Sequence, residues 1–124
     1  MNKEHYFYRN IIFSKKGKQV ALIDLNDPSK TEELDAWFGM VISLADGQHT
    51  ISEFTTLVAK MYGERTPPNL QETIDSVFKR IIESKFIILS EEKTELPYYM
   101  SMPYELLDLP RAKKLYAEDR EKVN

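Results

Sequence analysis

The most constraining feature of this chain is a short junction near its centre, where two amphipathic segments meet. From Asp46 the sequence runs Asp-Gly-Gln-His-Thr-Ile-Ser-Glu-Phe. Gly47 can adopt a positive φ at little steric cost, which suits the end of a helix. Thr50 and Glu53 have the spacing of a capping box, in which each side chain accepts a hydrogen bond from the backbone N–H of the other. The junction therefore predicts two helices joined by a tight turn.

Apolar residues on both sides of this junction recur with helical spacing. We expect a first helix over residues 35–44 with Asp35 as its N-cap, a second from Ile51 to about Tyr62, and a third over residues 69–84. The expected inward faces are Trp37, Met40, Val41 and Leu44 in the first helix, Ile51, Phe54, Val58, Met61 and Tyr62 in the second, and Leu70, Ile74, Val77, Phe78 and Ile81 in the third.

The residues before these helices favour β-structure. Residues 6–13 and residues 19–25 are rich in aromatic and branched side chains, and Gly17 between them suits a tight turn. We expect the two runs to form a hairpin, followed by a turn at residues 26–29. Residues 30–34 are too polar for a central strand. They predict either an extension of the first helix or a charged edge strand.

This order of elements indicates a single α+β domain over residues 1–90. The expected arrangement is winged helix-turn-helix-like, with an N-terminal β-hairpin or three-stranded sheet packed on three helices and an extended piece at residues 86–89. Residues 91–124 form a C-terminal extended and helical arm, with Pro110 in the first turn of its helix. Residues 96–104 of the arm hold two prolines, three tyrosines and two methionines. We expect the arm to pack back on the domain, outside any binding groove.

The composition excludes several kinds of chemistry. The chain has no cysteine and only His5 and His49 as histidines, so thiol catalysis and Cys- or His-based metal sites are not expected. No Gly-rich phosphate loop is present. The net charge of −3 shows no basic stripe of the kind that binds nucleic acid. The apolar runs are far shorter than the roughly 20 residues of a membrane span, and the first residues lack a signal-peptide core. We therefore expect a cytoplasmic protein that is no enzyme and has no cofactor, nucleic-acid or membrane partner.

The segment from Trp37 to Leu89 resembles the PqqD-like family, the RiPP recognition elements. That family carries Asp-Gly-x-x-Thr-(Ile/Val)-x-Glu-(Ile/Leu) at the same junction, where this chain has the residues from Asp46 to Phe54. The resemblance covers about residues 6–90, and the arm has no counterpart in the short stand-alone members. It implies capture of the leader of a ribosomally synthesised precursor peptide. It also implies presentation of that precursor to a modifying enzyme, often a radical SAM enzyme.

The resemblance further implies that the peptide adds as a strand beside residues 30–34 and lies against the third helix. An edge strand offers unpaired N–H and C=O groups that supply affinity for any extended peptide. On the third helix Phe78 and Ile82 lie to one side of the core stripe, which favours a groove wall with a polar rim. The candidate peptide-binding residues are Thr31, Glu32, Glu33, Leu34, Gln71, Asp75, Phe78, Lys79 and Ile82.

The sequence leaves two other functions open. A DNA-binding winged-helix regulator would place the third helix in the major groove. Residues 70–85 carry three acidic and three basic side chains, however, which makes this helix a poor partner for phosphates. An oligomerisation or adaptor domain would use the Tyr- and Met-rich arm as its contact surface, with a second copy of the chain in a homodimer as one partner. Peptide binding is the function that the sequence favours.

Overall fold

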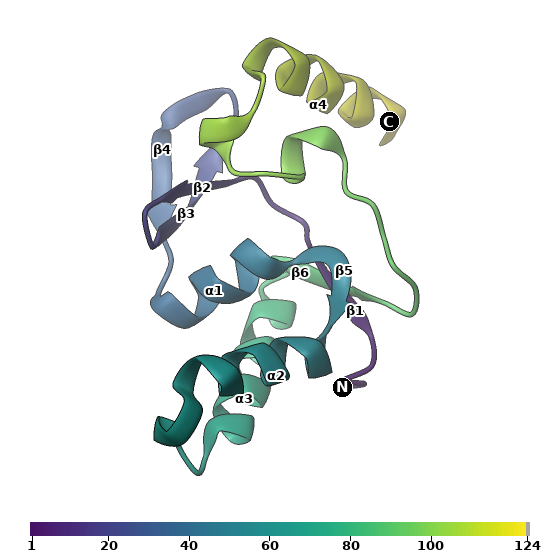
Figure 1. Cartoon of the computed structure of the whole chain (residues 1–124). Helices are drawn as coiled ribbons and strands as arrows, with labels where there is room; N and C mark the ends of the chain where they lie inside the picture. The colour runs from purple at the N-terminus through teal and green to yellow at the C-terminus, as the bar shows by residue number, and fades with distance from the viewer. Residues whose placement is uncertain (124) are drawn as a thin grey trace.

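The computed structural model describes residues 1–123, with side chains up to residue 121, and shows an α+β fold with two three-stranded sheets (Figure 1). The strands are β1 (Tyr6–Arg9), β2 (Phe13–Lys16), β3 (Gln19–Asp24), β4 (Asp27–Glu33), β5 (Asp46–Thr50) and β6 (Ile87–Ser90). The helices are α1 (Ala36–Leu44), α2 (Ile51–Tyr62), α3 (Leu70–Glu83) and α4 (Leu109–Val123), with 3-10 turns η1 (Gly63–Arg65), η2 (Tyr98–Met100) and η3 (Tyr104–Leu106). The sheets have the orders β5-β1-β6 and β2-β3-β4, and all neighbouring strands are antiparallel.

Of the hairpin predicted over residues 6–25, the structure contains only the part from residue 13 onward. Lys16 lies opposite Gln19, so β2 and β3 are joined by a two-residue turn in which Gly17 has a φ of 62°. β1 leaves this hairpin and pairs with β5 and β6 in the other sheet. The prediction of one hairpin from residue 6 to residue 25 was therefore wrong. Its first run divides into two strands because Phe7 of β1 packs into the core beneath α2 and α3.

The turn after the hairpin was also misplaced. Asp24 lies opposite Asp27, so the chain reverses at residues 25–26 and β4 begins three residues before the predicted strand. Pro28 lies inside β4, where the register with β3 shifts. Proline is tolerated there because β4 is an edge strand.

The helix starts follow the predicted caps. The Asp35 side chain accepts a hydrogen bond from Phe38 N–H at 2.8 Å. At α2 the Glu53 carboxylate accepts from Thr50 N–H at 3.0 Å, and Thr50 Oγ1 accepts from Glu53 N–H at 3.1 Å. The hydrogen bond from Thr50 N–H holds the pKa of Glu53 below its ordinary value. The five predicted core residues of α3 are all buried.

Two helices bury other residues than predicted. In α1, Gly39, Val41 and Ile42 are buried, whereas Trp37, Met40 and Leu44 are half-buried. The helix turns this side inward because Gly39 lies against β3, where a Cβ atom would come within 3.1 Å of Val20. In α2, Met61 and Tyr62 are 66% and 38% exposed, because the core contacts of this helix end at residues 58–59.

The side chains of residues 1–121 form two hydrophobic clusters. In the larger one, the rings of Phe7, Phe54 and Phe78 meet edge to face at 5.1–5.9 Å. Such ring pairs are worth about 0.5–1.5 kcal/mol beyond the area they bury. The smaller cluster joins Leu25 to the arm residues Tyr99, Leu107 and Ala112. The arm therefore packs back on the rest of the chain, as predicted. No helix within residues 1–123 is both long and apolar enough to cross a lipid bilayer.

Candidate functional site

The outer edge of β4 is unpaired in the described part of the chain. Leu34 N–H donates to Val20 C=O of β3 at 2.9 Å. Hydrogen-bonded residues alternate along an antiparallel pair, so the backbone groups of Glu32 also face β3. The N–H and C=O groups of Thr31 and Glu33 then point outward. Since the side chains of residues 28–33 are all exposed, β4 presents a row of accessible donors and acceptors.

The opposite edge of the same sheet is covered by the arm. Glu105 of η3 accepts from Lys15 N–H at 2.9 Å and from Ser14 Oγ at 2.5 Å. Burial by itself raises the pKa of Glu105, but the hydrogen bonds from Ser14 and Lys15 outweigh it and hold this pKa below its ordinary value of 4.5. One carboxylate therefore closes β2 to further pairing, while β4 stays open.

The residues predicted on α3 face away from β4. Gln71 donates to Asp75 at 2.8 Å, and Asp75 forms an ion pair with Lys3 at 3.4 Å. This flank of α3 therefore faces the N-terminal segment. Phe78 is fully buried against Phe7. Its assignment to a groove wall was wrong, because β1 supplies a ring that covers it.

The other predicted residues are divided between surface and core. Lys79 is exposed on the outer face of α3, whereas Leu34 and Ile82 are half-buried against the main cluster. The flank of α3 that faces α1 carries Arg80, whose guanidinium lies 5.3 Å from the ring centroid of Phe38. α1 packs against both β3 and α3 and lies between them (Figure 1). The structure thus groups Thr31, Glu32 and Glu33 on β4 without bringing the predicted α3 residues beside them.

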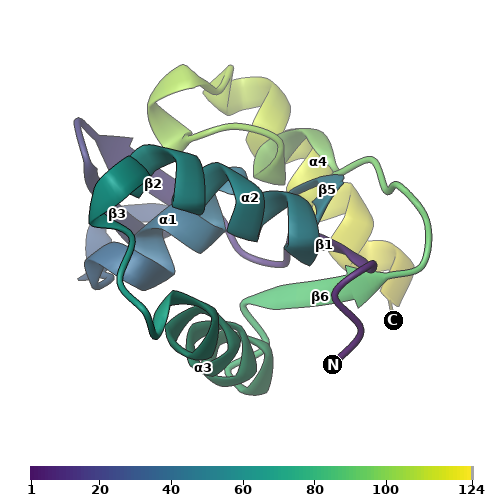
Figure 2. The ribbon, with the colours of Figure 1, turned by 60° about the horizontal axis from the view of Figure 1, so that its bottom comes forward.

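The arm and α3 occupy opposite sides of the molecule. Figure 1 shows α1 between α3 and α4, and Figure 2 shows α2 between α3 and the arm. The second wall of any groove beside β4 therefore comes from the arm, which sequence reasoning left outside the site.

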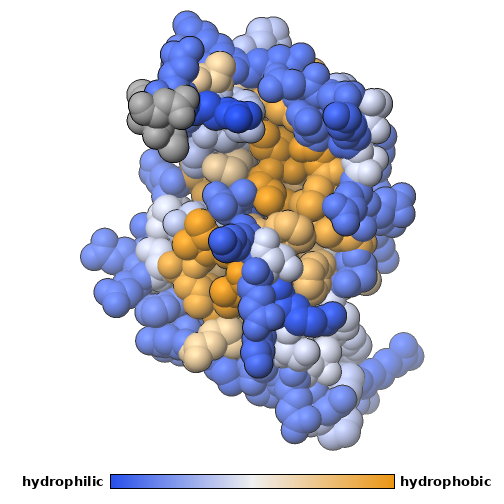
Figure 3. Space-filling model, turned by 180° about the vertical axis from the view of Figure 1, so that it is seen from behind, coloured by the Kyte–Doolittle hydropathy of each residue, from blue (hydrophilic) through white to orange (hydrophobic). Residues whose placement is uncertain are grey.

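A hollow of about 920 Å³, which we call the arm groove, lies between β4 and the arm. Its apolar lining residues, which we call the floor, are Ile11, Ile12, Leu22, Ile23 and Leu25. Residues 29–32 of β4 form one wall, and Tyr99, Met100, Tyr116 and Arg120 form the other. From behind, Figure 3 shows an apolar area on this face with hydrophilic side chains around it. Two of the predicted site residues, Thr31 and Glu32, line the arm groove.

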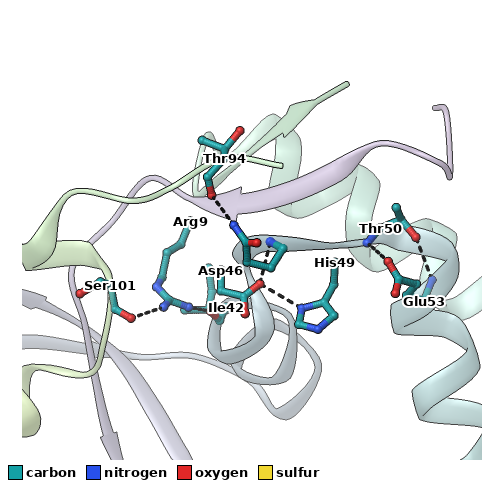
Figure 4. A network of polar contacts seen from close by, with 9 residues as sticks. Arg9, Ile42, Asp46, His49, Thr50, Glu53, Thr94 and Ser101 are labelled. Atoms are coloured by element: carbon teal, nitrogen blue, oxygen red, sulfur yellow. Dashed lines mark hydrogen bonds and ion pairs between the residues drawn. The ribbon is translucent and has the colours of Figure 1, made fainter. Parts of the chain in front are cut away.

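Arg9 fixes the arm in place, and sequence reasoning missed this residue. The residue is 3% exposed, and its side chain donates to Met100 C=O at 2.6 Å. It also donates to Ser101 C=O at 3.1 Å and to Ile42 C=O at 2.9 Å (Figure 4). Burial lowers the pKa of Arg9 to about 10, although the nearby Asp46 carboxylate opposes this shift. The available signal was its position two residues after Phe7, on the same face of β1.

The linker before the arm is attached to β5, which the sequence had predicted to be a turn. Gly47 has a φ of 78°, and a Cβ atom there would lie 2.1 Å from Thr94 O. Thr94 N–H donates to Gly47 C=O at 3.0 Å, and Thr94 C=O accepts from Gln48 at 3.2 Å (Figure 4). A glycine is therefore required both for the backbone conformation and for the close approach of the linker.

His49 and Asp46 form an exposed pair beside this attachment, with His49 Nδ1 3.0 Å from Asp46 Oδ1. Within the described residues, no three His, Asp or Glu side chains are close enough together to hold a metal ion. Comparison of the chain with protein-family models, with curated proteins and with solved structures found no match.

Proposed function

We propose that this chain is a non-catalytic peptide-binding domain that takes up an extended peptide as an added strand along β4. The observation that carries the proposal is the open edge of β4, on a sheet whose other edge is covered by Glu105. Backbone hydrogen bonds to Thr31 and Glu33 would supply affinity, and pockets for alternate side chains would supply selectivity.

The biological ligand in this proposal is the leader of a ribosomally synthesised precursor peptide, presented in the cytoplasm to a modifying enzyme such as a radical SAM enzyme. Support comes from the resemblance to the PqqD-like family, which rests on the Asp46 to Phe54 junction and on the order of a helix before it and two helices after it in the sequence. Contact of the peptide with Phe78 is not part of the proposal, because that ring is fully buried.

A substitution at the edge of β4 tests this function. Thr31→Pro removes an outward N–H and places ring atoms where the ligand backbone would lie, while pairing with β3 is kept. Lys15→Pro makes the same change at the covered edge. The probe is a library of random twelve-residue peptides displayed on their mRNA, selected on the full chain, with the enriched peptides then synthesised and titrated.

We expect Thr31→Pro to weaken binding at least about tenfold, or about 1.4 kcal/mol, and Lys15→Pro to leave the affinity of the folded protein unchanged. Equal affinity of Thr31→Pro and wild type would contradict the proposal, as would a selection that enriches nothing. Sedimentation of the free chain distinguishes peptide uptake from pairing of two copies through β4, since the proposal predicts a monomer that binds peptide in a one-to-one complex.

A further inference from the structure

We propose that the arm groove is the selectivity site for this peptide, and that it takes a large apolar side chain on its floor with a neighbouring carboxylate held by Arg120. This inference rests on strand addition along β4 and goes beyond it by naming the class of peptide. The preferred ligand is an extended segment in which a bulky aliphatic or aromatic residue stands close to Asp or Glu.

The position of the groove connects it to the open edge. Residues 29–32 of β4 line the groove, and Thr31 among them also offers an outward backbone N–H. Side chains of a strand alternate between its two faces. A peptide paired with β4 would therefore place every second side chain on the face of the sheet against which the arm packs through Glu105 and Ser14.

The size and floor of the groove fit an apolar side chain. A volume of about 920 Å³ lies within the range of small-ligand sites. Ile11, Ile12, Leu22 and Ile23 on the floor are only half-buried, so each still exposes apolar surface. Covering this surface with an apolar side chain of the peptide is favourable because it removes both apolar surfaces from water.

The charges around the groove favour an acidic residue on the arm side. Among the side chains that the structure describes, none forms an ion pair with Arg120, whose guanidinium donates to Tyr116 OH at 3.3 Å. Lys30 on the opposite wall is paired with Asp27 at 3.8 Å. Glu32 repels a carboxylate near β4. Arg120 is therefore the group that can form a bidentate pair with a peptide carboxylate.

The wall that carries Arg120 is held in place by three contacts. Arg9 binds the carbonyl groups of Met100 and Ser101 in the arm. Tyr99 OH donates to Asp119 at 2.7 Å, and the rings of Tyr99 and Tyr116 meet edge to face at 5.2 Å. These contacts fasten α4 to the segment that Arg9 holds, so the part of the helix that carries Arg120 is attached to the rest of the arm.

The experiment uses the full chain and the same displayed library. Arg120→Glu is compared with Arg111→Glu, which changes an arginine of the same helix that lies 4.2 Å over the Tyr98 ring and outside the groove. Wild type and Arg111→Glu should both enrich peptides with a large apolar residue near Asp or Glu. Arg120→Glu should instead enrich Lys or Arg at the acidic position.

Titration of synthetic peptides makes the test quantitative. For the peptide enriched on wild type, we expect about tenfold weaker binding after its acid is changed to Lys or after Arg120→Glu. Combining both changes should restore most of the affinity. Replacing the apolar residue of the peptide by Ala should also weaken binding at least about tenfold, because the floor is left uncovered.

Two results would overturn the inference. If Thr31→Pro abolishes binding while Arg120→Glu and the Ala peptide leave it unchanged, the peptide pairs with β4 but does not use the arm groove, and the proposed function stands without the inference. If Arg120→Glu weakens binding of the acidic and the basic peptide equally, Arg120 does not select the peptide by its charge. Failure of the wild-type chain to enrich any peptide would remove the proposed function itself.

Discussion

The two edges of the β2-β3-β4 sheet differ, because the arm covers β2 and leaves β4 uncovered. At β2, the arm supplies a carboxylate that accepts from Lys15 N–H and from Ser14 Oγ. At β4, no segment of the described chain covers the outward groups of Thr31 and Glu33. An uncovered edge strand is a template for pairing with another chain. The contrast between the two edges therefore locates the surface that is left for a partner.

The open edge also carries features that oppose pairing with copies of itself. Lys30, Glu32 and Glu33 are exposed along β4, and Pro28 interrupts its donors near one end. Charges and proline are common ways of protecting an edge from aggregation. An edge that is open and yet protected in this way is suited to a selected ligand.

The largest expected effect comes from releasing the cover of β2. Arg9→Ala leaves the carbonyl groups of Ile42, Met100 and Ser101 without their buried donor, and we expect a loss of about 3 kcal/mol in the free energy of unfolding. Arg111→Ala, at an exposed arginine of α4 that contacts the Tyr98 ring, should cost no more than about 1 kcal/mol. Urea denaturation measures both values. Similar losses for the two variants would show that Arg9 does not hold the arm.

A smaller effect is expected from proline at each edge. Lys15→Pro removes the hydrogen bond from Lys15 N–H to Glu105, which should cost about 1 kcal/mol because the site is partly exposed. Thr31→Pro removes no hydrogen bond of the free protein, and its cost should stay below about 0.5 kcal/mol. Thermal unfolding of both variants tests the comparison. A larger loss for Thr31→Pro would mean that Thr31 N–H is paired in the free chain.

The smallest effect is a pH dependence confined to the covered edge. The folded-state pKa of Glu105 lies below 4.5, so its contribution to stability is present above pH 4.5 and is lost as the pH falls through the folded-state pKa. We expect protection of the Lys15 amide against hydrogen exchange, corrected for the intrinsic rate, to decline in acid below that value. Glu105→Gln should remove this decline. A decline that persists in the Gln variant would assign the titration to another group.

Local signals in the sequence predicted part of this fold well. The capping box at Thr50 and Glu53, the Asp35 cap and the buried face of α3 follow from spacing within a few residues, and all three are confirmed. Long-range pairing was not predictable in this way. Nothing within residues 6–13 indicates that β1 pairs with β5 and β6, since those partners lie about 40 and 80 residues away in the chain.

The candidate site likewise has one part that local sequence signals predicted and another that depends on contacts between distant segments. The polar pattern of residues 30–34 left an extension of the first helix and a charged edge strand as alternatives, and the structure places residues 30–33 in the edge strand β4. The second wall was placed on α3, because helical spacing identifies a flank without showing what covers it. Arg120 and the floor of the arm groove come from segments about 100 residues apart. Only the packing of the arm on the hairpin brings them together.

On the proposed function, a peptide pairs with β4 and not with β2. Amide hydrogen exchange of the full chain, measured residue by residue by NMR with and without the enriched peptide, tests it most directly. We expect new protection of the Thr31 and Glu33 amides on binding, with Lys15 and the amides of α3 unchanged. New protection along α3 or at Lys15, with Thr31 and Glu33 still exchanging freely, would contradict it.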